Sequence, residues 1–148
     1  MSWSDDAIKE AISWLGTPHH NEARVKGAGV DCGQLLIAVY ETAGVLPPGA
    51  CEPEHYPPDF AMHRGEEKYL GWIQKFCDPA SGDPLPGDIA VFQFGRCVSH
   101  AGILMGDNKI IHSYIRMGVI ISDLNEVIFF DKQNESRLRG IYRPKAGD

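Results

Sequence analysis

The sequence predicts an α+β domain in which the helices come first and an antiparallel sheet follows. Two patterns indicate this order. Apolar residues recur at helical spacing in the first half of the chain, whereas short apolar runs separated by turn residues fill the part after Asp88. A length of 148 residues with 43% hydrophobic residues suits one domain, residues 1–148, with a buried core.

Three helices are expected before the sheet. Their bounds, read from the apolar spacing, are residues 4–15, 32–43 and 66–76. Ser4 is expected to cap the first helix, and Gly44 is expected to end the second. The Gly- and Pro-rich segments are expected to be loops: residues 17–31, 46–58 and 79–87.

Short apolar runs then predict the strands of the sheet. Their expected bounds are residues 89–94, 101–105, 109–114, 119–122 and 139–143. The cluster Gly106-Asp107-Asn108 between two of these runs is typical of a hairpin turn. Helices followed by a series of such short strands predict an antiparallel sheet in an α+β domain.

The charge balance excludes several classes of partner. The chain has 14 Lys and Arg against 20 Asp and Glu, a net charge of -6. Nucleic-acid binding is not expected without a basic surface, and an anionic membrane would repel this chain. No apolar run reaches the length of a membrane span, and the first residues lack the basic and apolar parts of a secretion signal. We therefore expect a protein made in the cytoplasm, with its four cysteines reduced.

Cys32 is the candidate nucleophile. It follows a Gly-rich loop and opens the second predicted helix. The positive end of the helix dipole and the free amides there favour a thiolate, and the same amides can stabilise an oxyanion. The competing interpretation is a small buried cysteine without a chemical role.

His100 and His112 are the candidate base and its orienting partner. A cysteine nucleophile needs an imidazole to take its proton, and that imidazole needs a partner on its other nitrogen. The two rings share one face of the sheet if Met105 pairs with Lys109. If Gly106 pairs with Lys109 they point apart, unless a bulge has the same effect as the longer loop. Two unrelated histidines on a sheet are the alternative.

Metal and cofactor sites find no support in the sequence. The cysteines are far apart, and there is no CxxC, HExxH, phosphate-binding loop or GxGxxG pattern. The adjacent pair His19-His20 could touch a metal ion, but adjacent residues seldom share one face. No metal and no cofactor are expected.

Five blocks together resemble the NlpC/P60 family of cysteine peptidases over nearly the whole chain. They are Leu15-Gly-Thr-Pro18, Lys26-Gly-Ala-Gly-Val-Asp-Cys-Gly33, Leu85-Pro-Gly-Asp-Ile-Ala-Val-Phe92, Ser99-His-Ala-Gly-Ile-Leu-Met-Gly106 and Ile111-His112. The resemblance implies a papain-like fold, with a nucleophile-bearing helix packed on five or six antiparallel strands. It also implies Cys32 as nucleophile, His100 as general base and His112 as the orienting residue.

The same resemblance implies the substrate. It is the peptide stem of bacterial peptidoglycan, often cut after a γ-linked D-glutamate. Substrate contacts are implied beside the triad, at residues His19, Asp31, Gly33 and Ser99. Two of these depart from the family pattern, because many relatives carry Tyr at the position of His19 and Ser at that of Gly33.

The Gly-Thr-Pro opening, the loop before Cys32 and the segment 56–60 look most like the phage-tail and gene-transfer-agent branch of the family. This implies phage tail proteins as partners and delivery to the cell wall by a tail. Two alternatives stay open: a tail component with little hydrolytic activity, and an acyl-transferring or amidase relative that uses the same triad.

Overall fold

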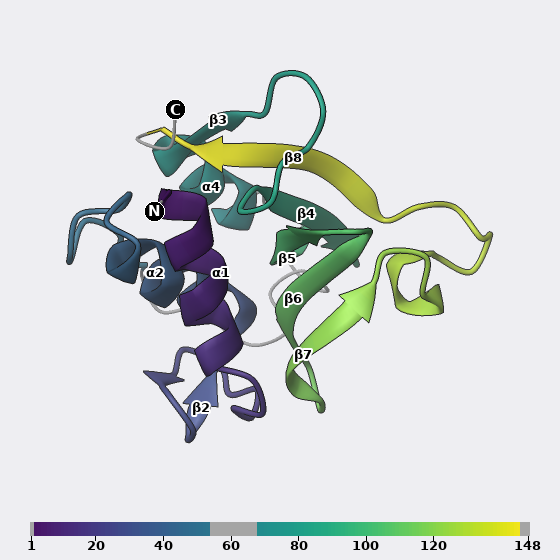
Figure 1. The fold of residues 1–148 in the computed structure, drawn as a ribbon. Helices are drawn as coiled ribbons and strands as arrows, with labels where there is room; N and C mark the ends of the chain where they lie inside the picture. Colours follow the sequence, from purple (N-terminus) through teal and green to yellow (C-terminus); the bar gives the residue numbers. More distant parts are fainter. Residues whose placement is uncertain (1, 54–67, 146–148) are drawn as a thin grey trace.

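The computed structural model describes residues 2–53 and 68–145 and confirms the α+β class (Figure 1). Its helices are α1 (Trp3–Ser13), α2 (Cys32–Thr42) and α4 (Lys68–Phe76). One antiparallel sheet has the order β3-β8-β4-β5-β6-β7. The strands are β3 (Cys77–Pro79), β4 (Ile89–Phe94), β5 (Cys97–Gly106), β6 (Lys109–Tyr114), β7 (Gly118–Asp123) and β8 (Leu138–Pro144). Parts of three predictions lie outside the described residues: residues 54–58 of the predicted loop 46–58, the segment 56–60, and residues 66–67 of the predicted helix 66–76.

The N-cap of helix α1 lies two residues earlier than predicted. Ser2, not Ser4, is the N-cap: its backbone is extended and its hydroxyl oxygen accepts the amide of Asp5 at 3.2 Å. Ser4 already has helical geometry, so its side chain cannot take that role. The helix ends before Gly16, whose φ of +85° suits glycine.

Helix α2 carries the central apolar stripe of the domain. Leu35, Leu36, Val39 and Tyr40 are all buried, as their spacing predicts. Figure 1 shows α1 and α2 side by side on one side of the sheet. Their apolar faces and one face of the sheet form the larger core.

The opposite face of the sheet forms a second, smaller core. Four of its buried members alternate along the strands with those of the larger core, and a fifth comes from outside the sheet: Ala90, Phe92, Leu104 and Ile110, and Phe129. Phe129 belongs to a short 3₁₀ helix, Val127–Phe129, which follows β7. The sheet is therefore covered on both sides, which explains why its central strands have little polar surface.

Three short strands were not expected. β1 (Arg24–Val25) pairs with β2 (Gly29–Val30) inside the predicted loop 17–31, and β3 pairs with β8 at the sheet edge. Strands of two or three residues are too short to show an alternation of apolar and polar residues, so the sequence does not predict them. In the described part of the chain, the helices are too short or too polar to span a membrane.

Candidate active site

Asp31 fixes the start of α2 and so positions the candidate nucleophile. One of its carboxylate oxygens accepts the amide of Gln34 at 2.8 Å, and the other accepts the amide of Glu22 at 2.7 Å. The residue is only 4% exposed. The structure thus places Asp31 as the helix cap, and its expected contact with substrate stays a prediction.

Cys32 is the first residue of α2, and its sulfur lies against the backbone of β5. The thiol donates to the carbonyl oxygen of Ser99, with Sγ and O 3.6 Å apart. The hydroxyl of Tyr69 and the amides of Ala101 and Gly33 lie near enough to the sulfur to favour its charged form. The sulfur of Cys32 therefore lies against the backbone of the two residues that flank His100, Ser99 and Ala101.

The protonation of Cys32 differs from the sequence-based expectation. Its position at a helix start predicts a lowered pKa, but burial and the nearby Asp31 carboxylate raise the pKa of this thiol to about 12. The Tyr69 hydroxyl and the two amides act in the opposite direction and lower the pKa of the thiol, because their polar hydrogens favour a thiolate. At neutral pH the side chain of Cys32 is therefore a thiol, because desolvation outweighs the groups that favour its charged form.

His100 and His112 are joined by a short hydrogen bond. Nε2 of His100 lies 2.7 Å from Nδ1 of His112, and both rings are buried. Nε2 of His112 in turn lies 2.9 Å from Oγ of Ser122 on β7. Burial lowers the pKa of His112 to about 4 and that of His100 well below 6.5. Both rings are therefore neutral at neutral pH.

A bulge brings the two histidines together. Gly106 pairs with Lys109 across a two-residue turn in which Asp107 and Asn108 both have positive φ. That pairing alone would point the rings apart. The register then shifts so that Leu104 pairs with Ile110, which gives the same effect as the predicted longer loop.

Gly102 allows β5 and β6 to approach closely at this point. A Cβ there would lie 2.7 Å from Cδ1 of Ile110 and 2.9 Å from Cβ of His112. Such distances are not tolerated between carbon atoms. The glycine two residues after His100 is therefore required by packing, since any side chain would push His112 away.

The remaining predicted site residues surround this group. His19 is half-buried, bridges to Val30, and is close enough to His100 to influence the pKa of that ring electrostatically. The hydroxyl of Ser99 donates to the carbonyl of Phe94, so its carbonyl and not its side chain meets Cys32. Their contacts with substrate stay predictions.

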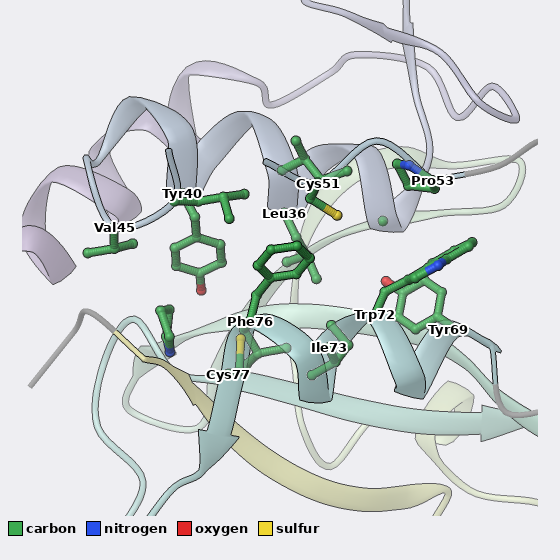
Figure 2. Close-up of a pocket in the computed structure, with 15 residues that line it drawn as sticks. Leu36, Tyr40, Val45, Cys51, Pro53, Tyr69, Trp72, Ile73, Phe76 and Cys77 are labelled. Atoms are coloured by element: carbon green, nitrogen blue, oxygen red, sulfur yellow. The ribbon is translucent and has the colours of Figure 1, made fainter. Parts of the chain in front are cut away.

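Tyr69 was not identified from the sequence. A Cβ on Gly33 would lie 3.3 Å from Cε2 of Tyr69, so this ring packs directly over the glycine beside Cys32. The ring is 4% exposed and borders an apolar pocket between α2 and α4 (Figure 2). Among the described residues predicted for the site, Gly33 lines this pocket and the others do not. No sequence signal links Tyr69 to Cys32, which it meets through tertiary packing.

Metal binding has no structural basis in residues 2–53 and 68–145. No group of three or more His, Cys, Asp or Glu side chains there could hold a metal ion. The four cysteines are free thiols.

The fold and the site together define a papain-like protein, with a cysteine at a helix start and a histidine pair on an antiparallel sheet. The profile of the NlpC/P60 family matches residues 13–138. This chain belongs to the NlpC/P60 family.

Similar proteins support that placement. The chain is 39% identical over 51 residues to the murein DD-endopeptidase MepS/murein LD-carboxypeptidase of Escherichia coli, which is 34% of this chain and 27% of that protein. The match thus spans about a quarter of the relative's length.

Two solved structures share the fold. An NlpC/P60 family protein from Bacillus cereus has a TM-score of 0.65 at 21% identity and is matched over 95% of this chain and 40% of that one. RipD from Mycobacterium tuberculosis, described as a non-catalytic NlpC/p60 domain protein adapted to peptidoglycan binding, has a TM-score of 0.61 at 14% identity, over 98% of each chain. The family therefore includes a member described as lacking catalysis.

Proposed function

We propose that this chain is a cysteine endopeptidase that hydrolyses amide bonds in the peptide stems of bacterial peptidoglycan. The observation that carries the proposal is the buried hydrogen bond between His100 and His112, formed where the sulfur of Cys32 meets β5. A thiol, a base and an orienting group in this order are the parts that nucleophilic acyl transfer needs.

The mechanism follows from the protonation states. Cys32 rests as a thiol and His100 as a neutral ring, so the proton moves from Sγ to His100 as the sulfur attacks the amide carbon. Because Nε2 of His100 is used by His112, Nδ1 receives that proton. His100 then protonates the leaving nitrogen, which leaves a thioester on Cys32.

Water completes the cycle. His100 takes a proton from a water molecule whose oxygen attacks the thioester carbon, and the proton returns to the departing sulfur. The amides of Gly33 and Ala101, which lie near the sulfur, are also close to the carbon that it attacks. They are the backbone donors that we propose for the oxyanion.

The substrate class rests on the family and on the E. coli relative, which is described as a murein peptidase. A γ-linked D-glutamyl bond is the expected point of cleavage within this class. Purified peptidoglycan incubated with the protein should release fragments cut at one stem-peptide bond, which mass spectrometry of the muropeptides identifies. Cleavage at the bond between sugar and peptide would instead indicate the amidase alternative.

Matched cysteine variants make this test specific. Cys32→Ala should release no fragments. Cys51→Ala removes another buried thiol, one that lines the pocket of Figure 2, and should leave hydrolysis intact. Equal product from the wild-type protein and Cys32→Ala would rule out the proposal.

A second candidate function is peptidoglycan binding without hydrolysis. It is favoured by the 8% exposure of Cys32 and by the pKa of about 12 that burial and the Asp31 carboxylate give its thiol. Under this alternative, the wild-type protein co-sediments with peptidoglycan and releases no fragments. Under the proposal, co-sedimentation is accompanied by cleavage.

We also propose that the protein acts as part of a phage tail, is made in the cytoplasm and is carried to the cell wall by the tail. Support comes from the Gly-Thr-Pro opening and the Gly-Ala-Gly-x-Asp-Cys loop. An antibody against the chain should detect it in purified tail particles. Its restriction to soluble cell extract in cells that produce tails would count against this part.

A further inference from the structure

A buried serine ends the hydrogen-bonded chain that starts at His100. Ser122 is 2% exposed, and its Oγ lies 2.9 Å from Nε2 of His112. On β7 the residue opposite His112 is Ile120, so Ser122 lies two positions further along the strand, on the same face.

Each neutral imidazole ring in this series of hydrogen bonds carries one N–H proton, on either Nδ1 or Nε2. A neutral imidazole has one N–H donor and one lone pair, so a hydrogen bond between two neutral rings can run in either direction. Burial keeps both rings neutral, since it lowers both pKa values. The direction of the hydrogen bond between Ser122 and His112 therefore sets which nitrogen of His100 carries the proton.

Only one direction leaves His100 able to act as a base. If Ser122 accepts from Nε2–H of His112, then Nδ1 of His112 accepts from Nε2–H of His100, and Nδ1 of His100 keeps its lone pair. If Ser122 donates instead, both rings carry their proton on Nδ1, and His100 cannot take one from Cys32 at that atom.

We propose that Ser122 is a positioning residue that accepts a hydrogen bond from His112 and thereby holds His100 in the tautomer with Nδ1 unprotonated. The inference rests on the proposed function, because only a general base needs this tautomer.

The surroundings make this hydroxyl important. The ring neighbours of His112 include Tyr114 and Phe129, with centroids 5.6 and 5.5 Å away, and Phe129 is buried. His112 itself is 0% exposed, so water does not readily replace a lost partner. An N–H left unpaired in such a place is costly, and loss of the hydroxyl therefore shifts the tautomers.

The test compares two variants of equal shape. Ser122→Thr keeps the hydroxyl, whereas Ser122→Val replaces it with a methyl group, and both add the same branch. Nitrogen-15 NMR of the imidazole rings in the full-length protein reports which nitrogen carries the proton. We expect Nε2–H on both rings in the wild-type protein and Ser122→Thr, and a mixture of tautomers in Ser122→Val.

Hydrolysis provides the second readout. Relative to Ser122→Thr, Ser122→Val should lose about tenfold in kcat with KM little changed, because the productive tautomer then leaves the buried Nε2–H of His112 unpaired. Nδ1–H on His112 in the wild-type protein would overturn the inference without any variant, and so would identical tautomers and kcat in both variants. Absence of hydrolysis by the wild-type protein with Nε2–H on both rings would reject the proposed function and leave the tautomer assignment standing.

Discussion

Gly102→Ala tests how strand packing sets the geometry of the histidine pair. The new Cβ would lie 2.7 and 2.8 Å from Cδ1 and Cγ1 of Ile110 and 2.9 Å from Cβ of His112. The tip of Ile110 can turn aside, but Cβ of His112 moves only with its strand. The substitution therefore separates β5 from β6 beside the site.

The size of the effect follows from these distances. An ordinary contact to Cβ of His112 requires about 0.5 Å of separation. The 2.7 Å hydrogen bond from His100 would then approach the long end of the usual range. Overpacking of this kind costs about 1–3 kcal/mol in the free energy of unfolding. Misplacement of a catalytic group costs up to about 100-fold in rate, so we expect a 10- to 100-fold loss in kcat/KM.

Urea unfolding and stem-peptide hydrolysis measure the two effects separately. Gly71→Ala is the matched control, because a Cβ on this glycine of α4 meets nothing within 4 Å and should stabilise the helix by about 1 kcal/mol. Adding Ile110→Val removes the contact at Cδ1 but not the contact at His112. The loss in free energy of unfolding in this double variant should be smaller than the sum of the losses in the two single variants, while its activity stays low. Wild-type activity and stability in Gly102→Ala would refute the packing argument.

Three further predictions concern the site residues themselves. His100→Ala should lower the rate of hydrolysis by about 10²- to 10⁴-fold and His112→Ala by less, with part of the loss restored in His112→Asn; full activity in His112→Ala would exclude it as the orienting group. Because burial holds the pKa of His100 well below 6.5, the base stays unprotonated as the pH falls, so the acid limb of the kcat/KM profile should lie below pH 6.5. An acid limb above that value would contradict the burial argument. Tyr69→Phe removes a hydroxyl that favours the thiolate, so iodoacetamide should alkylate Cys32 about tenfold more slowly. The control is Tyr142→Phe, which removes a hydroxyl that contacts Gln74 and should leave the rate unchanged. An unchanged alkylation rate in Tyr69→Phe would contradict this role of its hydroxyl.

Much of the fold could be predicted from the sequence, because its longer elements have clear periodicity. The predicted bounds of β4 and β6 agree with the structure residue for residue. β5 starts four residues earlier than predicted, at Cys97, where the register shifts between Phe92 and Gln93 and polar residues interrupt the apolar run. Alternation fails at such irregularities, and so they cannot be located from the pattern alone.

The candidate site could also be predicted only in part from the sequence. The sequence points to Cys32, His100 and His112 by residue type, and the hairpin argument anticipates the bulge that joins the two rings. Tyr69 and Ser122 were missed because their partners are 37 and 10 residues away in the chain and meet them only after folding. The pKa of Cys32 was predicted in the wrong direction, since a sequence shows a helix start but not the depth of burial.

The central claim is that Cys32 attacks a stem-peptide amide, and a covalent intermediate tests it most directly. Stem peptide is mixed with the wild-type protein, the reaction is quenched in acid within the first turnover, and the intact protein and its proteolytic fragments are weighed by mass spectrometry. The account predicts a mass increase equal to the acyl part of the peptide, located on the fragment that contains Cys32. Release of cleaved peptide with the acyl group on another residue, or undiminished release by Cys32→Ala, would contradict it.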